Sequence, residues 1–203
     1  MEKIKKAPCT VVLIAINVII FFTLTMFGAT EDTVFMLEHG AMYVPYLTQK
    51  QEYYRIFTSM FLHYGFEHLM GNMVILGALG WQLEQQLGAV KYIILYLVSG
   101  LGGQIAMIYY QIFTNNMAPF AGASGAIFGV TGALLYVAVR NKGRVGQVSG
   151  PGLLVMIVIS VVYGFTNPGI ANFAHIGSLI SGFFLGILLY RKGNRKSSSV
   201  VRD

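Results

Sequence analysis

The sequence predicts an all-α membrane protein: a bundle of six transmembrane helices with a long first outer loop that is partly embedded in the membrane. Of the 203 residues, 55% are hydrophobic and only 11% are charged, whereas soluble domains carry about 25% charged residues. Six apolar segments are long enough to be read as membrane spans. They are 8–27, 66–87, 92–113, 122–139, 153–165 and 171–190. Because the sequence shows no internal repeat, we expect residues 1–203 to form a single domain.

The first apolar segment follows a basic stretch, but it is too long for the core of a signal peptide, so we expect an uncleaved membrane helix. The loop after it, 28–65, carries four acidic residues and also the apolar, aromatic stretch FTSMFLHYGF. Such a composition is typical of a segment that lies in the interface or dips into the membrane. The fifth segment, 153–165, is the shortest, and we expect its helix to include flanking residues.

The basic residues predict the orientation. Twelve of the fourteen Lys and Arg residues lie on one side of the six segments, and only Lys50 and Arg55 lie on the other. Since cytoplasmic loops are enriched in Lys and Arg, both termini are expected in the cytoplasm. The prediction is therefore a multi-pass protein of the cell membrane with short basic tails at about 1–7 and 191–203.

Four polar side chains lie at the starts of the second, fourth and sixth segments. These are His68 and Asn72, four residues apart on one helix face, then Ser124, then His175. In a six-helix protein with both ends inside, these three helices all run inward from the outer surface. The four side chains are therefore expected at one depth, just below the outer surface.

A serine and an imidazole at one depth can form a nucleophile and its base. Small residues repeat along the fourth segment (Gly125, Gly129) and the sixth (Gly182, Gly186), and such faces let membrane helices approach closely. The approach would bring His175 to Ser124, where the imidazole would accept the hydroxyl proton and return it to a leaving amine.

Acyl transfer also needs donors for an oxyanion, and the candidates are His68, Asn72 and the backbone N–H of Ser124. Each residue alone has a simpler interpretation. Ser124 and its glycines could serve helix packing, His68 a proton path, Asn72 an interhelical hydrogen bond, and Phe128 the core. Phe128, one turn after Ser124, also lies on the face where His175 could stack.

Other chemistries lack their residues. HExxH is absent, and Asp32 and Asp203, the only aspartates, lie outside the apolar segments, which excludes a paired-aspartate protease. One cysteine, Cys9, excludes an internal disulfide and a multi-cysteine metal site. No phosphate-binding or dinucleotide motif and no basic face with interleaved aromatics is present. The sequence therefore predicts no cofactor, no metal and no nucleic acid.

The chain resembles the rhomboid family of intramembrane serine proteases, in the six-helix form found in bacteria. Four ordered motifs carry the resemblance, which runs from about Tyr53 to Gly186. They are HYGFEHLMGN with His63, His68 and Asn72; YLVSGLGG; GASGAIFG with Ser124; and AHIGSLISGFFLG with His175. Two positions depart from the family pattern: Tyr54 replaces the usual Trp before Arg55, and Ser178 replaces a usual Gly.

The resemblance implies a Ser124–His175 dyad that cleaves single-pass membrane proteins near the outer face through an acyl-enzyme. It implies an oxyanion site of His68, Asn72 and the Ser124 N–H, and a substrate-binding role for Gly122, Phe128 and His63. It also implies a structural role for Glu84. Two alternatives stay open: a non-catalytic pseudoprotease that binds membrane proteins through the same fold, and a transporter that uses the histidines as proton relays.

Overall fold

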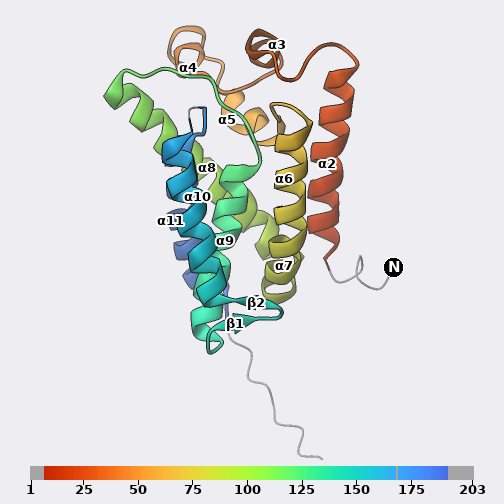
Figure 1. Ribbon diagram of the computed structural model, residues 1–203, viewed down its shortest axis with the longest axis vertical. Helices are drawn as coiled ribbons and strands as arrows, with labels where there is room; N and C mark the ends of the chain where they lie inside the picture. The colour runs from red at the N-terminus through yellow and green to blue at the C-terminus, as the bar shows by residue number, and fades with distance from the viewer. Residues whose placement is uncertain (1–6, 168, 192–203) are drawn as a thin grey trace, which may run out of the picture.

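The computed structural model describes residues 7–167 and 169–191. The terminal tails expected at about 1–7 and 191–203 therefore lie almost entirely outside the described residues. Helices occupy all six of the predicted apolar segments (Figure 1). They are α2 (Pro8–Thr25), the continuous run α6 (Phe66–Ile75), η2 (Leu76–Gly80) and α7 (Trp81–Leu87), then α8 (Ala89–Thr114), α9 (Ser124–Arg140), α10 (Gly150–Thr166) and α11 (Asn172–Leu189).

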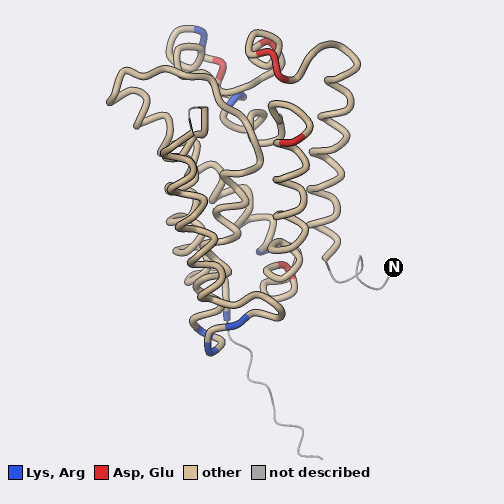
Figure 2. Tube along the Cα trace, viewed as in Figure 1, with Lys and Arg blue, Asp and Glu red and all other residues tan. Residues whose placement is uncertain are grey.

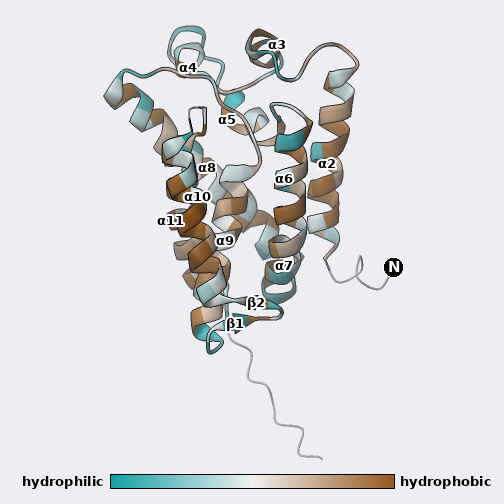
Figure 3. Ribbon diagram, in the orientation of Figure 1, coloured by the Kyte–Doolittle hydropathy of each residue, from teal (hydrophilic) through white to brown (hydrophobic). Residues whose placement is uncertain are grey.

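Three of the described helices, α2, α8 and α11, are long and apolar enough to cross a membrane, judged by length and composition. Helices α9 and α10 are also apolar but have 17 residues each. Hydrophobic residues occupy the middle of the bundle, and more hydrophilic residues occur toward its two ends (Figure 3). This distribution is that of a protein whose central belt faces hydrocarbon.

Local chemistry explains where the helices begin. Helix α10 starts three residues before the predicted boundary because the Ser149 hydroxyl accepts a hydrogen bond from the Gly152 N–H at 3.1 Å. Helix α9 starts at Ser124, two residues later than predicted, because Gly122 has a φ of 142°, which no helix contains. Helix α10 extends beyond both ends of the predicted segment 153–165, so the expectation that the fifth helix includes flanking residues is confirmed.

The first loop folds into short helices above the bundle rather than remaining irregular. They are α3 (Thr33–Glu38), α4 (Val44–Lys50), α5 (Arg55–Thr58) and the 3₁₀ turn η1 (Ser59–Phe61) (Figure 1). The buried Arg55 anchors this loop: its guanidinium donates to the carbonyls of Leu37 at 2.6 Å and Ala41 at 2.9 Å and pairs with Glu52. These Arg55 contacts form with Tyr54 as the preceding residue.

A two-stranded hairpin connects α9 to α10, and the sequence did not predict it. Strands β1 (Arg144–Val145) and β2 (Val148–Ser149) pair antiparallel. Lys and Arg gather at this end of the molecule, whereas most Asp and Glu lie at the opposite end near α3 (Figure 2). The charge asymmetry read from the sequence is therefore present along the long axis of the fold.

The buried Glu84 on α7 holds the start of α2. Its carboxyl oxygens accept hydrogen bonds from the N–H of Cys9 at 2.9 Å, the N–H of Thr10 at 2.7 Å and the Thr10 hydroxyl at 2.7 Å. The first N–H groups of a helix have no partner within that helix. Glu84 therefore links the second helical run to the first helix.

Helices α8, α9 and α11 form the most closely packed part of the bundle. At Gly129 of α9 a side chain would overlap Ser99 of α8, and at Gly182 of α11 it would overlap the backbone of Gly129. Ser178 fits at its fully buried position because Gly103 and Gly125 leave room for its hydroxyl. This backbone-to-backbone packing determines how closely the residues at the outer ends of α9 and α11 approach each other.

Candidate active site

Ser124 and His175 meet at the outer ends of α9 and α11. His175 Nε2 lies 2.8 Å from Ser124 Oγ, within hydrogen-bonding distance. Ser124 is the first residue of α9, and His175 lies in the first turn of α11. The contact expected from the small-residue faces of these two helices is therefore present.

Packing orients the His175 ring. Phe128 stacks on it with ring centroids 4.3 Å apart and planes 6° apart. His175 Nδ1 is buried and, within the described part of the chain, has no hydrogen-bond partner. The stack and the bond to Ser124 thus define the orientation of the imidazole without a third polar residue.

Gly122 brings His68 next to Ser124. Its φ of 142° lies where residues with a side chain are strained. A Cβ at this position would lie 2.9 Å from His68 Cε1, 3.0 Å from His68 Nε2 and 3.6 Å from Ser124 Oγ. The imidazole of His68 on α6 therefore approaches the backbone just before the serine, and only glycine leaves room for it.

Asn72 lies one turn after His68 on the same helix. Its side-chain amide Nδ2 is buried and has no hydrogen-bond partner among residues 7–167 and 169–191. A buried donor without a partner is costly. The amide is therefore available to a group that enters the site.

His63, for which the resemblance implies a substrate-binding role, is only 1% exposed. Its Nε2 accepts a hydrogen bond from the N–H of Ala123 at 3.4 Å. Its ring and the His68 ring pack edge to face, with their centroids 5.2 Å apart. Burial, with a smaller contribution from His68, lowers the pKa of His63 to about 3. His63 is therefore neutral near pH 7, as an acceptor at Nε2 must be.

The segment before Ser124 is tied to the first loop. Met42 and Phe120 exchange two backbone hydrogen bonds of 2.9 Å, and the Gly122 N–H donates to the Ser59 carbonyl at 2.9 Å. On the other side, the buried Gln111 of α8 donates to the Ala118 carbonyl at 2.7 Å. These hydrogen bonds hold the chain segment before Ser124 in an extended conformation.

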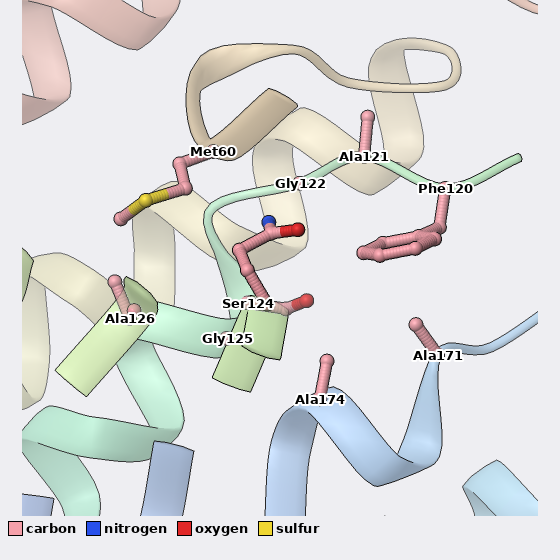
Figure 4. Close-up of a pocket in the computed structure, with 11 residues that line it drawn as sticks. Met60, Phe120, Ala121, Gly122, Ser124, Gly125, Ala126, Ala171 and Ala174 are labelled. Carbon is pink, nitrogen blue, oxygen red and sulfur yellow. The ribbon is translucent and has the colours of Figure 1, made fainter. Parts of the chain in front are cut away.

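A small pocket opens beside Ser124 (Figure 4). Most of its walls are glycine and alanine, and its larger side chains are Met60, Phe120 and Gln104. The lining residues are Met60, Gly100, Gln104, Phe120, Ala121, Gly122, Ser124, Gly125, Ala126, Ala171 and Ala174. The sequence reading did not identify Met60 or Gln104, because nothing local in the sequence indicates that η1 and the middle of α8 meet at the serine.

Among the described residues, no group of three or more His, Cys, Asp or Glu side chains could hold a metal ion.

A family model of the rhomboid domain matches residues 50–192. The chain belongs to the rhomboid family. With its three helices of spanning length, this member of the rhomboid family is an integral membrane protein.

Three similar proteins come from a bacterium and a plant. The chain is 36% identical over 184 residues to Rhomboid protease GluP of Bacillus subtilis (strain 168), covering 91% of this chain and 35% of that protein. It is 36% identical over 151 residues to RHOMBOID-like protein 1 of Arabidopsis thaliana, covering 73% of this chain and 38% of that protein. RHOMBOID-like protein 5 of Arabidopsis thaliana is 35% identical over 147 residues, 70% of this chain and 46% of that protein. The chain thus spans less than half the length of these relatives.

Proposed function

We propose that this protein is an intramembrane serine endopeptidase that cleaves single-pass membrane proteins in or near their transmembrane segments. The observation that carries the proposal is the 2.8 Å contact between His175 Nε2 and Ser124 Oγ beside a pocket. A hydroxyl that is hydrogen-bonded to an imidazole is the arrangement that activates a serine nucleophile. The name of the relative GluP and membership of the rhomboid family support the same class of activity.

In the proposed reaction, Ser124 Oγ attacks the scissile carbonyl carbon while His175 Nε2 accepts the hydroxyl proton. The tetrahedral intermediate collapses, the C–N bond breaks, and His175 delivers the proton to the leaving amine. An acyl-enzyme on Ser124 remains. Water, deprotonated by the same imidazole, then attacks the ester, and the departing Ser124 oxygen recovers its proton.

The developing oxyanion needs hydrogen-bond donors in place before the reaction. The proposed donors are the Ser124 N–H, the ring of His68 and the Nδ2 of Asn72, which has no partner among the described residues. Gly122 supports this set because its missing side chain makes room for His68. His63 takes a positioning role in the proposal in place of the substrate contact, because it is buried and bonded to the Ala123 N–H.

The proposed topology has six membrane spans, both termini in the cytoplasm and the active site toward the outer side, within one domain of residues 1–203. It is supported by the excess of Lys and Arg at the hairpin end and of acidic residues at the α3 end (Figure 2). The first loop, partly embedded in the membrane in this arrangement, lies over the outer ends of the helices. A substrate must be extended at the cut, because a helix hides its carbonyls in internal hydrogen bonds.

The test is cleavage of a single-pass membrane substrate by purified protein in detergent and in proteoliposomes. Cleavage should be lost in both Ser124→Ala and His175→Ala, and a fluorophosphonate should label Ser124 in the unmodified protein. Ser181, whose hydroxyl lies lower on α11, provides a control in Ser181→Ala, which should still cleave. Substrate binding without cleavage would favour the pseudoprotease, and cleavage that survives either dyad substitution would refute the proposed chemistry.

A further inference from the structure

The side chain of Gln104 lines the pocket beside Ser124, and its amide has no hydrogen-bond partner among the described residues. Gln104 is 6% exposed, it lines the pocket, and its Oε1 is buried without a hydrogen bond in the described part of the chain. Neither the family motifs in the sequence nor the dyad accounts for this amide. A buried amide is expected to be hydrogen-bonded, so one without a partner needs an explanation.

A second glutamine on the same helix is partnered at its nitrogen, although its Oε1, like that of Gln104, has no hydrogen-bond partner among the described residues. Gln111 lies seven residues further along α8, on the same face, and its amide donates to the Ala118 carbonyl at 2.7 Å. That bond holds the extended segment before Ser124. Gln104 lies nearer the serine, between glycines and alanines that offer no side-chain hydrogen-bonding group.

The rest of the pocket restricts the size of an occupant. A side chain at Gly100 would overlap the Met60 methyl group, so Met60 already fills the space above that glycine. A Cβ at Gly125 would lie 3.3 Å from the Ser178 hydroxyl, so that wall is also closed. The space beside Ser124 therefore suits a side chain of one or two heavy atoms and excludes branched and aromatic ones.

We infer that Gln104 is a specificity-determining residue that selects serine over alanine at the substrate position on the acyl side of the scissile bond. The inference rests on the proposed function, because it is the attack by Ser124 that brings this substrate residue to the pocket. The substrate hydroxyl donates to Gln104 Oε1 and accepts from its Nε2. Alanine fits the same space but leaves the amide unpaired, and a site with an unpaired polar group discriminates against the ligand that lacks the matching group.

The experiment compares transmembrane substrates that are identical except for serine, alanine or 2-aminobutyrate at the cleavage position. The 2-aminobutyrate side chain has the size of serine with a methyl group in place of the hydroxyl, so it separates hydrogen bonding from volume. We expect kcat/KM of the unmodified protein to be about five- to tenfold higher for serine than for either apolar residue, the effect of one neutral hydrogen bond. In Gln104→Met the ratio should fall to about one, mainly through slower cleavage of the serine substrate.

Gln111→Met is the matched control, because it removes an amide from the same helix outside the pocket. It should change the rates for all three substrates by the same factor and leave the serine preference intact. A serine to 2-aminobutyrate ratio near one in the unmodified protein would overturn the inference, and this measurement needs no variant to fold. An equal loss on all substrates in Gln104→Met would also overturn it, because it would place the amide on the substrate backbone or on water. Cleavage of none of the substrates, or cleavage that survives Ser124→Ala, would instead refute the proposed function.

Discussion

Gly122→Ala tests whether the backbone before the serine determines the position of His68. The new Cβ would lie 2.9 Å from His68 Cε1 and 3.0 Å from Nε2, whereas ordinary van der Waals contact begins at 3.4 Å. The ring must therefore retreat by about half an ångström, or the backbone must move and carry the Ser124 N–H with it. The φ of 142° adds strain, which costs about 1–3 kcal/mol for a residue with a side chain.

The two costs predict different readouts. The strain lowers Tm by about 2–12 °C, since 1 kcal/mol shifts Tm by about 2–4 °C in a protein of this size. The displaced donors affect catalysis more: loss of one oxyanion donor lowers kcat by about 10²–10³. We therefore expect Gly122→Ala to stay folded at assay temperature and to cleave a membrane substrate about 100-fold more slowly, measured as kcat/KM in proteoliposomes.

Gly71→Ala is the control, since Gly71 is an exposed helical glycine with no atom within 4 Å of its would-be Cβ. Alanine is the better helix former by about 1 kcal/mol, so this variant should be as active as the unmodified protein and at least as stable. Activity of Gly122→Ala within about threefold of the unmodified protein, with its Tm lowered as expected, would refute the reasoning. It would mean that neither His68 nor the Ser124 N–H has to lie where the structure has them.

Three further predictions concern stability. Glu84→Ala leaves the N–H groups of Cys9 and Thr10 and the Thr10 hydroxyl without their acceptor and should cost about 2–5 kcal/mol. Removal of the exposed carboxylate in Glu67→Ala, on the same helical run, should change Tm by less than about 2 °C, and equal Tm values for the two variants would contradict this. The pKa of His63 is about 3 in the folded protein and about 6.5 when unfolded, so the unfolded state takes up the proton first as pH falls, and this histidine should account for about 2 kcal/mol of the stability lost between pH 7 and 5. The loss should be smaller by about that amount in His63→Gln, and an equal loss in both proteins would exclude His63 as a source. Asn172→Ala removes the hydrogen bond from α11 to a carbonyl of α10 and should lower Tm by about 2–4 °C. Asn167→Ala, whose side-chain amide donates within α10, should lower Tm less. The reverse order would contradict a role for Asn172 in joining the two helices.

The helices and the meeting of Ser124 with His175 could be predicted because their signals are local and add up along the chain. Long apolar runs define helices, and glycines at four-residue spacing indicate which faces pack. His68 and Asn72 share a face for the same reason. The membrane crossing of all six helices and the roles of these residues remain predictions.

Other features depend on contacts between segments distant in sequence. Gln104 lies in the middle of an apolar helix, where its spacing looks like any packing position, and only the fold brings Met60 and Phe120 to it. The same holds for the pairing of Met42 with Phe120, which no periodicity indicates. His63 belongs to the second-helix motif, but its burial and its hydrogen bond with the Ala123 N–H are seen only in the fold, so the sequence could not distinguish a substrate contact from a supporting role.

The contact between the backbones of Gly129 and Gly182 has a consequence for how a substrate could enter. One turn or two beyond the nucleophile and its base, two peptide backbones meet with no compressible side chain between them. In the proposed mechanism, separating α9 from α11 would also separate Ser124 from His175, so these two helices must stay in contact throughout the reaction. A substrate that enters from the lipid would then have to pass between elements that contact each other through side chains alone. Those side chains can rearrange while the Ser124 hydroxyl and the His175 imidazole stay together.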